Sequence, residues 1–210
     1  EHIGKIPLVM ITPGDINLLI EGSEERRKFI DATISQIDRN YLRDLQNYAA
    51  LIVQRNAQIK KFNEQHRVDR VFIEIMDERI YPLAKKIHEK RAEFIKELWP
   101  LFSKFYSFIS GDEESVEINY VSNFNPEMDA KQFVNSLERD LQLNRTQIGI
   151  HKDDFDFLLQ GRLIRKFGSQ GQVKSFLIAI KLAQYYFLAK KSKEIPILCL
   201  DDIFEKIDQN

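Results

Sequence analysis

Two stretches near the C-terminus carry residues whose types and spacing suit phosphate and cation chemistry. One is the segment GSQGQ, from Gly168 to Gln172, which opens an apolar helical pattern; the other is an apolar strand pattern that ends at Asp201 and Asp202. Glycine permits close backbone approach, and the first N–H groups of a helix favour an anion. A carboxylate at a strand end can bind a hard cation directly or through water. The two stretches predict the phosphate-contacting and magnesium-holding parts of an ATPase.

Composition narrows the class of protein without naming a partner. With 43% apolar and 30% charged residues, the chain is typical of a globular protein, and its net charge of −1 means that any nucleic-acid contact requires a local basic face. The single cysteine, Cys199, excludes an intramolecular disulfide framework. No apolar run approaches the roughly 20 residues of a membrane helix, and no signal peptide is visible. We therefore expect a cytoplasmic protein without membrane contact.

The elements that must position these residues begin with a strand and three helices. Residues 6–20 predict a strand that turns at Pro13-Gly14, and Ser23 is the expected N-cap of a helix. A second apolar stripe covers residues 41–62 and is interrupted at Arg55-Asn56. A third helical pattern covers residues 71–109, in which Pro100 is expected to kink or divide the helix.

The C-terminal half predicts the remaining strands and the apolar helix. The patterns are a turn at 111–114, a strand at 116–121, a helix at 130–143, a hairpin at 155–164 and a nearly all-apolar helix at 170–190. A narrow polar stripe at Lys174 and Lys181 interrupts that last helix. The order of elements predicts two lobes, with the first and last segments of the chain in one sheet.

In their order and spacing, several motifs resemble the RecF family, bacterial recombination and repair ATPases of the ABC class. The motifs extend over nearly the whole chain: Pro13 to Asp15, Glu25 to Asp31, Gln54 to Asn56, Gly149 to Asp154, Phe167 to Gln172, and Leu200 to Phe204 with Asp208. The resemblance implies an α/β fold, a P-loop NTPase-like ABC ATPase head fragment with a mostly helical lobe II, a small β hairpin and strands of the ATPase sheet. Residues 1–22 would end lobe I with a Q-loop-like turn, 23–145 form lobe II, and 146–210 return to lobe I.

The resemblance also assigns roles to individual residues. The ABC signature, which contacts the γ-phosphate held by the opposite subunit, falls on Ser169, Gln170, Gly171 and Gln172. Asp201 matches the Walker B carboxylate that serves Mg²⁺, Asp202 falls at the general base, and Asp208 would close the D-loop.

Four departures from the family pattern qualify these assignments. Gln170 replaces a usual glycine, Asp202 is shorter than the usual glutamate, and Thr12 and Pro13 stand near the usual Q-loop glutamine. The phosphate loop G-x-x-x-x-G-K-[ST] is absent from the sequence. Because the chain also lacks an initiator methionine and stops just after the acidic pair, we expect a fragment that carries half of an ATP site and is inactive alone.

For the intact parent, the resemblance implies an ATPase with ATP and Mg²⁺ as cofactors, acting in recombinational repair. It implies a homodimer that sandwiches ATP and binds DNA at gaps or junctions, with RecR and RecO as partners. Two alternatives stay open: a structural DNA-tethering head of the SMC or Rad50 kind, which requires long heptad arms, and a protein-interaction module that has lost catalysis.

Two charged segments favour structural interpretations over chemical ones. The segment from His151 to Asp154 has adjacent residues that point in opposing directions, so we assign it no metal site and expect it to border the nucleotide or an inter-lobe hinge. Arg26 and Arg27 open a helix, where a charged pair is usually a solvated face or an ion-pair partner of Glu24 and Glu25.

Overall fold

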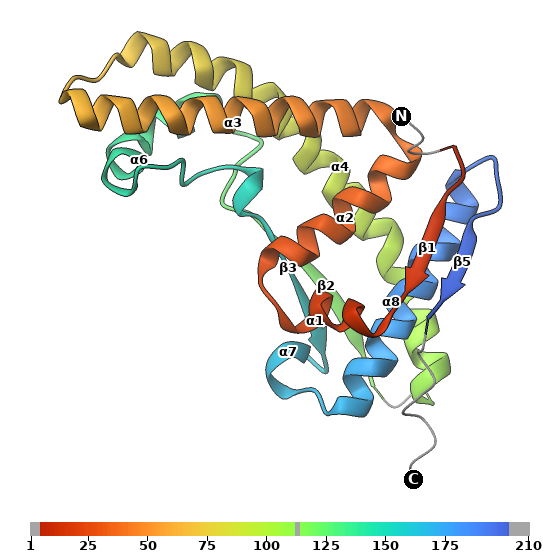
Figure 1. Ribbon diagram of the computed structural model, residues 1–210. Coiled ribbons are helices and arrows are strands. Elements are labelled where there is room, and N and C mark those ends of the chain that lie inside the picture. The colour runs from red at the N-terminus through yellow and green to blue at the C-terminus, as the bar shows by residue number, and fades with distance from the viewer. Residues whose placement is uncertain (1–4, 112–113, 202–210) are drawn as a thin grey trace. The chain divides into compact units, whose positions relative to one another are not determined.

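The computed structural model describes residues 5–111 and 114–201 of the chain. The chain clusters into two compact units (Figure 1). Unit 1 comprises Glu1–Arg39, Glu93–Tyr120 and Asp154–Asn210, and unit 2 comprises Asn40–Ala92 and Val121–Asp153. The predicted lobe boundaries at 22 and 145 stay a prediction, because compactness alone does not assign a segment to a lobe of an ATPase head. No helix within the described residues is long and apolar enough to span a membrane.

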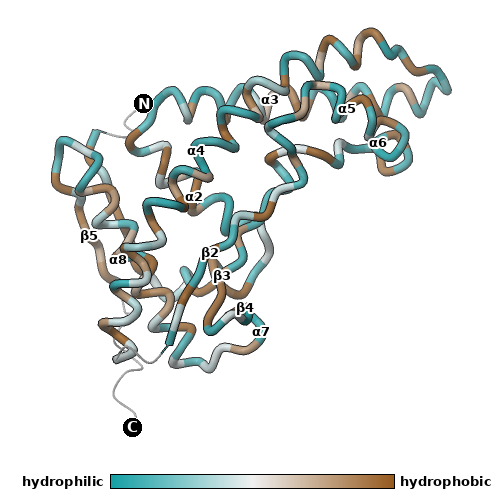
Figure 2. Tube along the Cα trace, turned by 180° about the vertical axis from the view of Figure 1, so that it is seen from behind, coloured by the Kyte–Doolittle hydropathy of each residue, from teal (hydrophilic) through white to brown (hydrophobic). Residues whose placement is uncertain are grey.

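Unit 1 contains a parallel pair of strands from the two ends of the chain. Strand β1 (Leu8–Ile11) lies beside β5 (Ile197–Leu200), with Leu8 opposite Ile197 and Ile11 opposite Leu200. This pairing confirms that the first and last segments share a sheet. Helix α8 (Gln170–Lys191) packs against β1, and apolar residues are prominent along β5 (Figure 2). Val9 and Ile11 are buried whereas Leu8 and Met10 are exposed, the two-residue period of a strand with one covered face.

A second, three-stranded sheet also belongs mainly to unit 1. Its strands are β2 (Val116–Val121), β3 (Asp154–Leu159) and β4 (Arg162–Leu163), in the order β2-β3-β4. Strands β3 and β4 form the predicted hairpin, and Gln160 and Gly161 both adopt positive φ in its tight turn. Short helices α1 (Asn17–Ile20) and α7 (Ile164–Phe167) and the longer α2 (Ser23–Ile37) complete this part of the unit.

Unit 2 is helical. It contains most of α3 (Arg39–Gln65), the first part of α4 (Arg70–Ser110), the short helices α5 (Lys131–Asn135) and α6 (Leu137–Leu143), and the 3-10 turn η2 (Ile150–Lys152). Ile59, Phe62, Ile73 and Leu137 form a buried apolar cluster between these helices. The apolar residues of α3 and of the first part of α4 in this cluster therefore face the core of this unit, as those of amphipathic helices do.

Three local predictions are corrected by the structure. At Pro13 the chain begins a 3-10 turn, η1 (Pro13–Ile16), instead of continuing the strand. Proline suits the first helical position, and the Asp15 carboxylate accepts a hydrogen bond from the N–H of Thr12, the N-cap. Helix α4 continues through Pro100, so the predicted division is absent there, and the buried residues Leu98 and Phe102 lie on either side of the proline. The N-cap of α2 is Gly22, with Ser23 as the first helical residue.

The helix predicted at 130–143 is two helices, with Ser136 at the junction. The Ser136 hydroxyl donates to Phe133 O at 2.9 Å and lies 3.2 Å from an Asp140 carboxylate oxygen. A serine side chain that hydrogen-bonds to the backbone offers it an alternative to continuing the helix, which accounts for the break.

Candidate functional site

The first turn of α8 is closed by reciprocal hydrogen bonds between Ser169 and Gln172. The Gln172 N–H donates to Ser169 Oγ at 3.2 Å, and the Ser169 N–H donates to Gln172 Oε1 at 2.8 Å. This arrangement is a capping box, which fixes the direction of the helix end. Ser169, Gln170 and Gly171 are exposed to solvent. The turn from Gly168 to Gln172, called the α8 turn below, is thus capped and accessible.

The two glycines of the α8 turn differ in the space around them. A Cβ on Gly168 would lie 2.6 Å from Ile164 Cδ1 and 2.8 Å from Ile164 O, so a side chain there would displace α7. A Cβ on Gly171 would meet no atom of the described part of the chain within 4 Å. Gly168 is therefore needed for packing, whereas Gly171 leaves open space beside the first N–H groups of α8. Those N–H groups have no acceptor within the helix and carry its positive dipole end.

A carboxylate that the sequence analysis missed also contacts the α8 turn. Gln172 Nε2 donates to Glu114 Oε1 at 2.5 Å, and the Tyr106 hydroxyl donates to Glu114 Oε2 at 2.6 Å. Burial of Tyr106, with the hydrogen bond to Glu114 and its charge, raises the pKa of this phenol. Tyr106 and Glu114 are distant in sequence from residue 172, and no motif marks either of them.

The carboxyl ends of the two parallel strands bring Asp201 beside the residue that follows β1. The Asp201 N–H donates to Ile11 O at 2.9 Å, and Thr12 continues directly from Ile11. Ligands of parallel α/β sheets bind at this edge, outside the carboxyl ends of the strands. Asp201 is exposed there, and its carboxylate is of the type that binds a hard cation. Asp202 and Asp208 lie outside the described residues.

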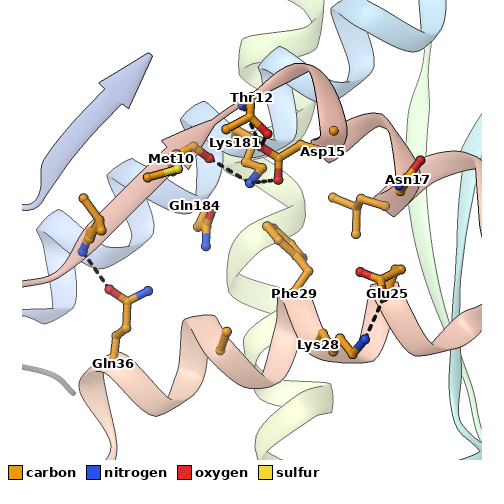
Figure 3. Close-up of a pocket in the computed structure, with 14 residues that line it drawn as sticks. Met10, Thr12, Asp15, Asn17, Glu25, Lys28, Phe29, Gln36, Lys181 and Gln184 are labelled. Carbon is orange, nitrogen blue, oxygen red and sulfur yellow. Dashed lines mark hydrogen bonds and ion pairs between the residues drawn. The ribbon is translucent and has the colours of Figure 1, made fainter. Parts of the chain in front are cut away.

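The segment after β1 is tied to the middle of α8 (Figure 3). The Thr12 N–H and hydroxyl donate to Asp15 Oδ2 at 2.7 and 3.1 Å, and Lys181 Nζ donates to Asp15 Oδ1 at 2.6 Å and to Met10 O at 2.9 Å. Lys181, predicted to lie in a polar stripe, is buried, because Asp15 compensates its charge inside unit 1. The sequence analysis quoted Asp15 only as part of a motif and missed this ion pair.

A cavity of about 410 Å³ lies between β1, α2 and α8 (Figure 3). Both lysines that line it are paired with carboxylates, Lys181 with Asp15 and Lys28 with Glu25. Gln36 of α2 accepts a hydrogen bond from the Leu8 N–H at 2.7 Å and closes part of the strand edge. Among the residues that the structure describes, the cavity therefore offers a phosphate no uncompensated positive charge, in contrast to the open end of α8.

Comparison with known proteins decides the family. No family model matches the chain, but the DNA replication and repair protein RecF of Flavobacterium johnsoniae is 47% identical over 209 residues, which cover 100% of the chain and 58% of that relative. RecF of Cytophaga hutchinsonii is 43% identical over 208 residues, 99% of the chain and 55% of the relative. The chain belongs to the RecF family.

Solved RecF structures show the same fold. Two structures of the recombination mediator protein RecF in the RecFOR pathway, described as RecF-ATP and RecF-ATPrS, each match with a TM-score of 0.91, at 33% and 32% identity. The matches cover 100% and 98% of this chain and 58% and 57% of those chains. The predicted fold class, an α/β fragment of an ABC ATPase head, is thereby confirmed. The chain spans a little over half the length of the RecF proteins it matches.

In this RecF-family chain, Arg26 is a buried structural residue, so the prediction of a solvated face is wrong. Its side chain is 2% exposed, and Nε and Nη2 donate to the two carboxylate oxygens of Asp154 at 2.6 and 3.1 Å. Burial alone would raise the pKa of Asp154, but the hydrogen bonds and charge of Arg26 lower it below its ordinary value. Glu24 and Glu25, which were predicted as possible partners of Arg26, form ion pairs with Lys28.

The segment from His151 to Asp154 is also structural in the RecF-family chain. His151 Nδ1 is 2.8 Å from the Tyr48 hydroxyl, and its Nε2 is 3.1 Å from Thr146 O. Asp153 is buried in unit 2 and accepts a hydrogen bond from Arg91 at 2.7 Å. Within the described residues, no group of three or more His, Cys, Asp or Glu side chains could hold a metal ion.

The polar interruption of the apolar stripe at Arg55 in α3 has a structural explanation in unit 2. Arg55 donates to Asp77 at 2.7 Å, to Asp140 at 2.6 Å and to Thr146 at 2.9 Å, and Arg55, Asp77 and Asp140 are each 0% exposed. Burial raises the pKa of Asp77, opposed by the hydrogen bond and charge of Arg55. These four residues, Arg55, Asp77, Asp140 and Thr146, are called the Arg55 cluster below. Their polar side-chain atoms bind one another inside the fold.

Proposed function

We propose that the chain is the signature and Walker B part of an ATP-dependent DNA-repair ATPase that binds ATP between two subunits. The observation that carries this proposal is the α8 turn, which is capped, exposed and open beside Gly171. A helix N-terminus with these properties suits a phosphate brought by another molecule. The match to structures named RecF-ATP and RecF-ATPrS supports ATP as the nucleotide.

In the proposed site, the Ser169 hydroxyl and the N–H groups of Gln170 and Gly171 donate to the γ-phosphate held by the opposite subunit. The Gln172 side chain keeps Ser169 in place through the capping box. Asp201 binds Mg²⁺, which when present neutralises charge on the phosphate oxygens. Asp202 is the proposed general base and Asp208 the proposed D-loop residue; both lie outside the described residues.

For the whole protein we propose a cytoplasmic homodimer that acts on DNA gaps or junctions with RecR and RecO. The names of the relatives, which specify DNA replication and repair, and of the solved structures, which specify the RecFOR pathway, support this role. Because the chain lacks the phosphate loop in its sequence, we expect the 210-residue chain alone to show no tight site in a calorimetric titration with Mg-ATP. Micromolar binding of Mg-ATP to this chain would contradict the proposal that it carries only half of an ATP site.

Mixing two variants of the full-length protein tests the composite site. Ser169→Arg blocks the α8 turn by its bulk, and a phosphate-loop variant removes ATP binding from the other half of the site. In a mixed dimer one composite site carries both lesions and the other carries neither, so partial ATPase activity is expected to return. No recovery, with mixed dimers shown to form and with a single intact site shown to be sufficient for turnover, would contradict a site assembled across the interface.

Asp202→Asn in the full-length protein separates binding from chemistry. Loss of a general base is expected to slow hydrolysis by about 10²–10⁴-fold while ATP binding and ATP-dependent dimerisation persist. Single-turnover hydrolysis and equilibrium nucleotide binding measure the two effects separately. Hydrolysis near the wild-type rate would show that Asp202 is not the base.

A further inference from the structure

Glu114 connects the α8 turn to the buried aromatic core of unit 1. Its Oε1 accepts from Gln172 Nε2 at 2.5 Å, and its Oε2 accepts from the Tyr106 hydroxyl at 2.6 Å. Tyr106 is 0% exposed, and its ring lies 5.9 Å from the ring of Phe176 in α8. Both carboxylate oxygens are therefore fixed by donors, and one of these donors is the residue that closes the α8 turn.

The side chain of Gln172 alone separates the charge of Glu114 from the positive end of α8. Gln172 spans the distance: its Nε2 donates to Glu114, and its Oε1 accepts the Ser169 N–H. The positive end of a helix favours an anion, and a second anion close to the first one opposes it. A phosphate bound at the α8 turn must therefore share this positive end with a resident carboxylate.

From this geometry we propose that Glu114 sets the strength of the contact between the α8 turn and the opposite subunit's γ-phosphate. Glu114 is a positioning residue with two opposing effects. Its hydrogen bond fixes Gln172 and through it Ser169, whereas its charge weakens phosphate binding and keeps the ATP-bound dimer reversible. The inference rests on the proposed function, because it requires ATP to be bound across the subunit interface.

The charge effect is tested with Glu114→Gln in the full-length protein. Glutamine keeps an Oε1 acceptor for Gln172 but removes the negative charge. At saturating Mg-ATP, the dimer dissociation constant is expected to fall about fivefold, the size of one charge acting near a helix terminus, while the affinity of the isolated subunit for ATP is unchanged. The gain is expected to shrink at high salt, because ions screen the interaction. A general effect on folding would not produce this salt dependence.

Two further variants separate charge from position. Glu97→Gln makes the same chemical change at the other end of α8, where Glu97 binds Lys191 at 2.7 Å, and is expected to leave the dimer dissociation constant unchanged. Glu114→Leu removes both the charge and the acceptor, so its dimer is expected to be severalfold weaker than that of Glu114→Gln. The difference between the two Glu114 variants isolates the hydrogen bond to Gln172.

Ser169→Arg distinguishes failure of this inference from failure of the proposed function. If Ser169→Arg abolishes ATP-dependent dimerisation but Glu114→Gln leaves it unchanged or weaker, the role of Glu114 is wrong and the composite site stands. If Ser169→Arg dimerises like the wild-type protein, both proposals are overturned. Sedimentation velocity with and without Mg-ATP measures dimerisation, and circular dichroism confirms that each variant is folded.

Discussion

The Arg55 cluster of unit 2 and the α8 turn of unit 1 both contain residues of the motifs that resemble RecF, but they use their polar groups in opposite ways. Arg55, Asp77 and Asp140 are each 0% exposed and bind one another. Ser169 and Gly171 are exposed and present a helix end to solvent. A motif in the sequence therefore marks a constrained position, and burial shows whether the constraint comes from the fold or from a ligand.

The largest expected effect concerns the buried member of this comparison. Arg55→Ala leaves two buried carboxylates without their cation and is expected to lower the free energy of unfolding by about 3–5 kcal/mol. Arg70→Ala is the matched control, because the ion pair of Arg70 with Glu138 is exposed and should change stability by less than about 0.5 kcal/mol. Urea denaturation measures both. Similar losses of unfolding free energy in the two variants would show that the buried ion pairs stabilise the fold no more than the exposed one.

A smaller effect is expected at the Arg26–Asp154 pair of unit 1. Asp154→Asn weakens charge-assisted hydrogen bonds to a buried arginine, at a cost of about 2–3 kcal/mol near neutral pH. Since the folded-state pKa of Asp154 lies below the ordinary value of 3.8, this contribution is present above pH 3.8 and is lost as the pH falls through the folded-state value. Denaturation midpoints of wild type and variant should therefore converge in acid. A constant difference would assign the effect to packing.

Gly168→Ala tests the packing side of the α8 turn. The new Cβ must move either Ile164 or the backbone, so we expect a loss of about 1–2 kcal/mol in the free energy of unfolding. Thermal unfolding followed by circular dichroism measures it. A neutral result would show that α7 adjusts freely and that Gly168 is not required for packing.

Gly171→Ala tests the open side of the same turn and has the smallest expected effect on stability, with the opposite sign. Alanine in the first turn of α8 meets no atom and is expected to raise stability by up to about 1 kcal/mol. Under the proposed function it also crowds the phosphate, so ATP-dependent dimerisation of the full-length protein should weaken. A variant that is both more stable and fully able to dimerise would place the phosphate contact elsewhere.

The sequence was sufficient for the elements with strong local signals. The apolar period predicted α3, the long and nearly all-apolar run predicted α8, and the Gln160-Gly161 pair marked the β3–β4 hairpin. The motif at residues 168–172 located the helix end that the structure shows as a capped, exposed turn. These features are predictable because each depends on residues close together in the chain.

Contacts between distant residues could not be predicted in the same way. Asp15 and Lys181 are 166 positions apart, and Glu114 and Gln172 are 58 positions apart. Arg26 was predicted to lie on a solvated face or to pair with Glu24 and Glu25, which are close in sequence. Its actual partner, Asp154, is 128 positions away. Charge type and helix position cannot distinguish these alternatives; only the packing of the elements does.

The outer edge of β1 has a consequence for self-association. Along this edge the Leu8 N–H is bound by Gln36 and the Met10 carbonyl by Lys181. An incoming antiparallel strand pairs with both the N–H and the C=O of a single residue, and at each of these residues one of the two is already occupied. Free strand edges are templates for aggregation. The side chains of Gln36 and Lys181 therefore also make this edge of β1 a poorer template for strands of other molecules.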